Sequence, residues 1–148
     1  MILRMSTVAS VYVVKSADLP GILEGGVEKL YEALPEQAEE LEDAFLWSGW
    51  VLYWVLDYLS QEGVDLASAR FDVPEDAIGM TIVEPAAKAL LPRLDPLTHK
   101  PTTLRAALAR RGTKFDEVEL AAFDALSMLY DAIEALPEDC VLVIECGV

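Results

Sequence analysis

Histidine and cysteine are scarce in this sequence, which limits the metal and redox chemistry open to it. Its 148 residues include one histidine, His99, and two cysteines, Cys140 and Cys146. A tetrahedral zinc site needs four such ligands, and the acidic residues 36–43 lack the oxygen spacing and the glycine of a calcium loop. We therefore expect neither a metal site nor another cofactor. On a single strand the two thiols would lie about 20 Å apart, too far for a disulfide, so we expect buried free thiols in a reducing cytoplasm.

Long hydrophobic runs are also missing. The longest uncharged stretch inside the chain, Ala44–Leu56, has 13 residues, whereas a membrane-spanning helix needs about 20. The start of the chain, Met1–Val14, faintly resembles a signal peptide, but serines and a threonine dilute it and no clear cleavage site follows. We expect no membrane anchor and a cytoplasmic location.

The motifs that usually reveal an enzyme are absent as well. The sequence contains no GxGxxG, no GxxxxGK[ST] and no GxSxG. His99 lies among prolines, and as a catalytic base it would need an orienting partner that a sequence cannot show. No catalytic residue can be named on these grounds.

Charge, by contrast, is abundant and sorted along the chain. Residues 1–87 carry 16 acidic against 4 basic residues, residues 88–114 carry 1 against 7, and residues 115–148 carry 9 against none. Burial alone does not require such sorting, so the pattern indicates surfaces of two electrostatic characters that meet each other or a partner. The net charge of −15 repels phosphate, which argues against binding to nucleic acid or to an anionic membrane.

The composition predicts one folded domain, residues 1–148. Hydrophobic residues make up 53% of the chain, with a mean hydropathy of +0.30, which is too apolar for disorder. Runs rich in β-branched residues predict terminal strands at Val8–Val14 and Cys140–Cys146, paired with each other, and a weaker strand at Ile78–Val83. We expect an α+β fold in which several helices pack on this small sheet.

Helical spacing and helix end signals predict the remaining elements. We expect a proline to lie in the first turn of a helix, and we expect a preceding helix to end at the residue before the proline. The stretch between Pro92 and Pro101 is predicted as a loop. The expected helices are Leu19–Glu24, Val27–Leu34, one long helix from Pro35 to Leu59, Glu84–Leu91, Leu104–Arg111 and Thr113–Leu136.

The long helix carries the most unusual side chains. Trp47, Trp50, Trp54 and Tyr58 share one stripe, and the opposite side is apolar too, so we predict a central helix with the tryptophans in the core. A ligand platform on the same stripe is the alternative. Asp57 on such a helix needs a partner, for which Arg105, Arg110 or a tryptophan N–H are candidates.

Two functions remain open. The first, favoured by the charge pattern, is non-enzymatic recognition of a basic protein, as in an inhibitor or immunity-type protein, through Glu36, Glu39, Glu40, Glu42 and Asp43. The second is a small intracellular enzyme or ligand-binding protein. Its pocket would be lined by Trp47, Trp50, Trp54, Asp57, Tyr58, Arg105 and Arg110. Residues 88–114, with seven lysines and arginines, form what we call the basic block. We expect its side chains to form ion pairs with the acidic helices rather than to bind a phosphorylated ligand.

Overall fold

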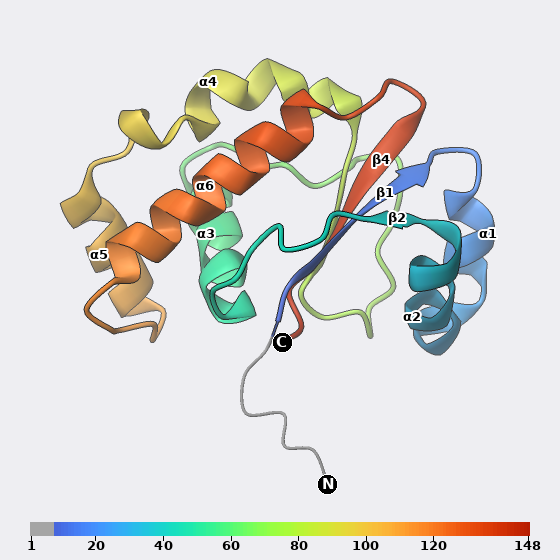
Figure 1. The fold of residues 1–148 in the computed structure, drawn as a ribbon, viewed down its shortest axis with the longest axis horizontal. Coiled ribbons are helices and arrows are strands. Elements are labelled where there is room, and N and C mark those ends of the chain that lie inside the picture. The colour runs from blue at the N-terminus through green and yellow to red at the C-terminus, as the bar shows by residue number, and fades with distance from the viewer. Residues whose placement is uncertain (1–7) are drawn as a thin grey trace, which may run out of the picture.

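A four-stranded antiparallel sheet forms the centre of the computed structural model, which describes residues 8–148 (Figure 1). The strands follow the order β2-β1-β4-β3 across the sheet. They are β1 (Ser10–Lys15), β2 (Glu39–Glu40), β3 (Met80–Val83) and β4 (Cys140–Glu145). The predicted α+β fold is confirmed. Residues 1–7, half of the N-terminal run considered as a signal peptide, lie outside the described residues.

The predicted pairing of the two terminal strands is also confirmed. β1 and β4 run antiparallel in register from Ser10 opposite Glu145 to Lys15 opposite Cys140. Because successive side chains of a strand point to opposite faces, Leu142 and Ile144 join one buried cluster and Val141 and Val143 join another. A strand in the middle of a sheet is covered on both faces, which explains its continuous apolar sequence.

Helices cover both faces of the sheet (Figure 1). On one face lie α1 (Leu19–Glu24) and α2 (Gly26–Gln37). The other face carries a larger layer, in which the long helix α6 packs against α3, α4 and α5. This layer consists of α3 (Gly49–Gln61), the 3-10 helix η1 (Pro85–Leu90), α4 (Leu91–Leu94), the 3-10 helix η2 (Pro96–Thr98), α5 (Pro101–Arg110) and α6 (Val118–Glu134).

The predicted long helix from Pro35 to Leu59 is wrong. α2 continues through Pro35 to Gln37, because Leu30 and Leu34 are buried beneath it and the missing N–H of proline removes a single helical hydrogen bond. Residues 38–48 then run along the sheet as β2 and an irregular segment, held where the Leu41 N–H donates to the Val11 carbonyl. α3 begins after Ser48, whose hydroxyl accepts from the Trp50 N–H.

Other boundaries differ by a few residues. The helix predicted from Thr113 begins at Val118, because the Thr113 N–H donates to the Leu108 carbonyl and so closes α5 instead. The third strand starts at Met80 rather than Ile78, and the segment after Glu84 is a 3-10 helix. The expected loop from Pro92 to Pro101 contains α4 and η2, each with a proline in its first turn. Across residues 8–148, none of the helices is long and apolar enough to cross a bilayer.

Candidate functional site

The predicted acidic site does not lie on one helix. Glu36 stands near the end of α2, Glu39 and Glu40 form β2, and Glu42 and Asp43 follow in the irregular segment. All five are exposed. Glu39 pairs with Val13 and Glu40 with Tyr12, so the two β2 side chains point to opposite faces of the sheet. Two of the five line hollows: Glu36 lines one between α1 and α2, whereas Asp43 lines one against α6, in the larger helical layer.

That hollow is a groove of about 490 Å³ between residues 43–47 and α6, which we call the acidic groove. Its carboxylates are Asp43 from the irregular segment and Asp124 and Asp131 from α6. Asp43 adopts a left-handed backbone conformation, φ 53°, which aspartate tolerates better than most residues. Apolar surface comes from the same two elements, and Leu46 is 80% exposed. The groove therefore brings together carboxylates from both acidic parts of the sequence, residues 1–87 and residues 115–148. Its full lining is Asp43, Ala44, Phe45, Leu46, Trp47, Asp124, Ser127, Met128 and Asp131.

Trp47 fixes the irregular segment against α6. Its indole N–H donates to a carboxylate oxygen of Asp124 over 2.7 Å. Its ring stacks on Phe115, with centroids 5.8 Å apart and an interplanar angle of 28°. Trp47 precedes the cap of α3, so it lies outside the helix on which it was predicted. It is partly exposed and lines the acidic groove.

The groove extends across α6 into a second hollow. Ser127 and Asp131 line both, and the second hollow, of about 220 Å³, adds Asp95, Pro96 and Tyr130. Asp95 also caps η2 by accepting from the Leu97 N–H. Across both hollows the lining contains four carboxylates and no lysine or arginine.

Five of the protein's lysines and arginines form ion pairs away from the acidic groove. Within residues 8–148, ion pairs join Lys15 to Asp139, Arg70 to Glu84, Lys88 to Glu138, Arg105 to Glu119 and Arg111 to Asp57. Three of the five use the basic block. None uses a carboxylate of the acidic groove or of the second hollow. No lysine or arginine therefore lines the acidic groove or forms an ion pair with its carboxylates in the described part of the chain.

Asp57 has a different partner from those predicted. Arg111, not Arg105 or Arg110, approaches it, with 2.8 Å between guanidinium Nε and the carboxylate. Arg111 follows α5 directly and its side chain is only 10% exposed. Arg105 instead makes two contacts with Glu119, raising the pKa of its own guanidinium and lowering that of the Glu119 carboxyl. Arg110 is exposed in the last turn of α5.

The tryptophan stripe is only partly in the core. Trp50 is 44% exposed and stacks on the half-buried Trp54, with centroids 5.9 Å apart, while Tyr58 is buried. The Tyr58 hydroxyl and His99 Nδ1 are 3.0 Å apart, and His99 Nε2 is 2.8 Å from the Arg93 carbonyl. In the neutral imidazole Nε2 carries the proton, because a carbonyl can only accept, and Nδ1 then accepts from the Tyr58 hydroxyl. Both ring nitrogens of His99 are therefore engaged in holding the structure.

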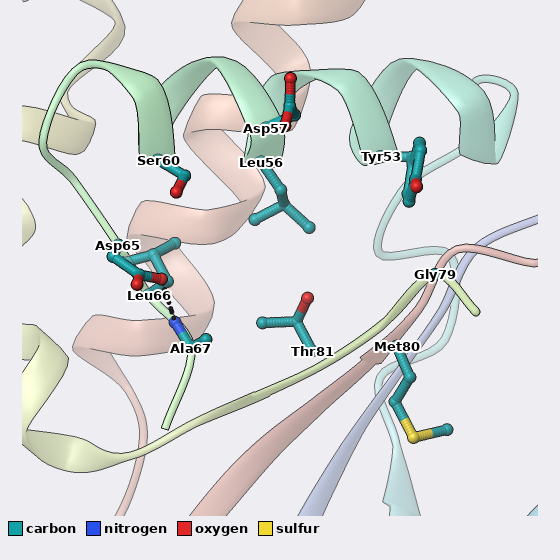
Figure 2. Close-up of a pocket in the computed structure, with 10 residues that line it drawn as sticks. All are labelled: Tyr53, Leu56, Asp57, Ser60, Asp65, Leu66, Ala67, Gly79, Met80 and Thr81. Atoms are coloured by element: carbon teal, nitrogen blue, oxygen red, sulfur yellow. Dashed lines mark hydrogen bonds between the residues drawn. The ribbon is translucent and has the colours of Figure 1, made fainter. Parts of the chain in front are cut away.

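The cleft beside α3 is not the predicted pocket. It has about 220 Å³, lies between α3 and β3, and includes Asp57 but no tryptophan and neither predicted arginine. In Figure 2, Leu56, Ser60 and Thr81 face the space between the two elements, whereas the Asp57 carboxylate points away from β3. The residues predicted to form a ligand pocket are not brought together there. In the described part of the chain, no three His, Cys, Asp or Glu side chains are grouped to hold a metal ion.

Asp124, Asp131 and Asp95 were missed by the sequence reasoning. A signal for two of them exists: α6 is buried along one face, and Asp124, Ser127 and Asp131 recur at intervals of three and four on its solvent face. That spacing predicts a row of polar side chains facing solvent, but it does not predict that residues 43–47 lie opposite the row. Comparison of the chain with protein-family models, with curated proteins and with solved structures finds no match.

Proposed function

We propose that this protein is a non-enzymatic binding module that recognises a basic protein partner through the acidic groove, in a role of the inhibitor or immunity type. The observation that carries the proposal is the groove itself: three carboxylates, exposed apolar surface and no cationic side chain in its lining. Charge complementarity then favours a partner whose contacting surface is basic, because like charges repel and oppositely charged groups replace water in the contact.

Apolar surface within the groove supports a protein rather than a free cation as the occupant. Leu46 and Trp47 expose apolar atoms beside Asp43 and Asp124. Interfaces between proteins combine an apolar centre, often aromatic, with a polar rim, and hydrated inorganic cations do not use apolar surface. Glu42 directly precedes Asp43 and adds an exposed carboxylate beside the groove, whereas Glu36, Glu39 and Glu40 lie on α2 and β2. Their exposed charges add to the negative field of the molecule, which accelerates the approach of a basic partner.

The proposal is tested by removing the groove's charge without changing its shape. In the triple variant Asp43→Asn, Asp124→Asn, Asp131→Asn, the amide oxygen at 124 can still accept from the Trp47 indole. The matched control, Glu24→Gln, Glu28→Gln, Glu32→Gln, removes the same charge from exposed residues of α1 and α2, on the other face of the sheet.

A partner is first captured from native host extract with the parent protein, identified and purified. Its association with all three proteins is then measured at low and high salt. We expect the groove variant to lose most binding, the control to retain it, and the parent's association rate to fall steeply with salt, since the Debye length is about 10 Å at 0.1 M. Equal binding by the groove variant and the control, or rates independent of salt, would contradict the proposal.

A further inference from the structure

We infer that the acidic groove binds an arginine side chain of its partner, whose guanidinium stacks on the Trp47 indole and forms an ion pair with the Asp124 carboxylate. This inference rests on the proposed function and makes it more specific, because a merely basic partner could present lysine equally well. The evidence is the way in which Trp47 and Asp124 are held together at one end of the groove.

The indole is held from two directions. Phe115 stacks on the Trp47 ring and Asp124 accepts its N–H, so ring and carboxylate keep a fixed relation to each other. Indole atoms still line the groove, and Trp47 is only half-buried. A preorganised aromatic ring beside a carboxylate loses little conformational entropy on binding, which favours recognition of a flat cation.

The Asp124 carboxylate retains capacity for a further donor. One of its oxygens accepts from Trp47, and an ionised carboxylate has about four lone-pair sites on its two oxygens. Within residues 8–148 no lysine or arginine of the chain forms an ion pair with it. A guanidinium has five N–H donors in one plane, so it can donate to Asp124 while its face covers the indole. Lysine has a compact, strongly hydrated ammonium that cannot do both with the same geometry.

A second cation position lies further along α6. Asp131 is seven residues beyond Asp124, which corresponds to about 10 Å along a helix axis. Asp43 lines the groove on the opposite side. Asp131 and Asp43 have no aromatic ring fixed to them by a hydrogen bond, so this second position accepts lysine or arginine without preference. The arginine specificity is thus confined to the Trp47 end of the groove.

The test uses three short probes: acetyl-Gly-Arg-Gly-amide, the same peptide with lysine, and the same peptide with citrulline, the uncharged analogue of arginine. Binding is followed by NMR of the indole N–H signals. The chain has three tryptophans, so three such signals arise, and the variant Trp47→Phe identifies the one belonging to Trp47. We expect the arginine peptide to shift the Trp47 signal in a saturable way, and the citrulline peptide to leave it unchanged.

The arginine peptide should bind roughly two- to fivefold more tightly than the lysine peptide, the fold-change corresponding to an exposed cation-π contact. Trp47→Leu should abolish this preference, read from the backbone amide signal of Ser127, which lines the groove. Trp54→Leu, a matched change outside the groove, should leave it intact. Asp124→Asn should weaken arginine and lysine peptides alike. Thermal melting of each variant shows whether it folds.

Several results would overturn the inference. Equal binding of arginine and lysine peptides, or a preference that survives Trp47→Leu, would remove the arginine specificity while leaving a basic partner possible. Shifts at Trp50 or Trp54 without one at Trp47 would place the cation outside the groove. The proposed function fails separately, when the purified partner binds the triple asparagine variant as well as it binds the parent.

Discussion

Two arginines with the same number of contacts but different exposure provide a direct test of how burial sets the strength of an ion pair. Arg111 donates to Asp57 over 2.8 Å, to the Gln61 side chain over 2.6 Å and to the Ala107 carbonyl over 2.7 Å. Arg105 makes three contacts as well, two with Glu119 and one with the Asp116 carbonyl. Their side chains are 10% and 46% exposed, respectively.

We expect Arg111→Met to lower the free energy of unfolding by about 2–3 kcal/mol. The contact with Asp57 contributes only about 1 kcal/mol, because that carboxylate is 42% exposed and water screens it. The bonds to Gln61 and to Ala107 contribute about 1 kcal/mol each, and methionine preserves much of the packing of the arginine stem. Arg105→Met should cost much less, because solvent replaces its contacts at little expense.

Urea unfolding of both variants, with the parent denaturation slope as a check on two-state behaviour, measures the difference. A double-mutant cycle of Arg111→Met with Asp57→Asn isolates the ion pair, whose coupling energy should be about 1 kcal/mol. If Arg111→Met lowers the free energy of unfolding no more than Arg105→Met does, burial of the arginine does not set the strength of its contacts, and the prediction is refuted.

Three further outcomes are expected. Burial raises the pKa of Glu145 above its usual value of 4.5, so ionisation there opposes folding; Glu145→Gln should stabilise the protein at pH 7, with the gain disappearing below about pH 4.5 in urea titrations at the two pH values. Burial also raises the pKa of the Cys146 thiol to about 12, so native protein at pH 8 should react with a thiol reagent at Cys146 only as fast as it unfolds, which mass spectrometry of labelled peptides can follow. Ser48→Ala should lower the free energy of unfolding by about 1 kcal/mol through loss of the α3 cap, and Ser48→Asp should restore it in the same assay.

The elements predicted best from sequence are those with one consistent signal. β1 and β4 are rich in β-branched residues and are apolar on both strand faces. Central strands of a sheet that is covered on both faces have that pattern. Their mutual pairing followed from the need of each strand for a neighbour. The face of α6 that is buried was similarly visible in the spacing of Leu126, Leu129 and Ile133.

The segment between Pro35 and Ser48 was mispredicted because tertiary contacts decide its structure. Proline was taken as a helix start, yet Leu34 and Leu30 hold α2 on the sheet and carry the helix past it. Glutamates 39 and 40 favour helix over strand by propensity, but the edge of β1 offers backbone partners that local preference does not include.

The acidic groove could be anticipated only in part. Charge sorting indicated that distant acidic blocks matter, and Asp43 was among the predicted residues. Its position opposite Asp124 and Asp131 depends on how the segment after β2 crosses α6, which no local pattern encodes. The partner of Asp57 was missed by one residue, because neighbours on a helix point about 100° apart and the prediction did not fix which arginine faced α3.

The position of β4 between β1 and β3 has a consequence for synthesis on the ribosome. The strand formed by residues 140–145 makes all the contacts that join β3 to the rest of the sheet, and its partner β1 is more than a hundred residues earlier. While translation proceeds, β1 and β3 lack this neighbour, and the backbone edges that pair with β4 stay open until residue 145 has left the exit tunnel. The sheet is therefore completed only after residues 140–145 have been made, and until then the open edges of β1 and β3 can pair with other strands.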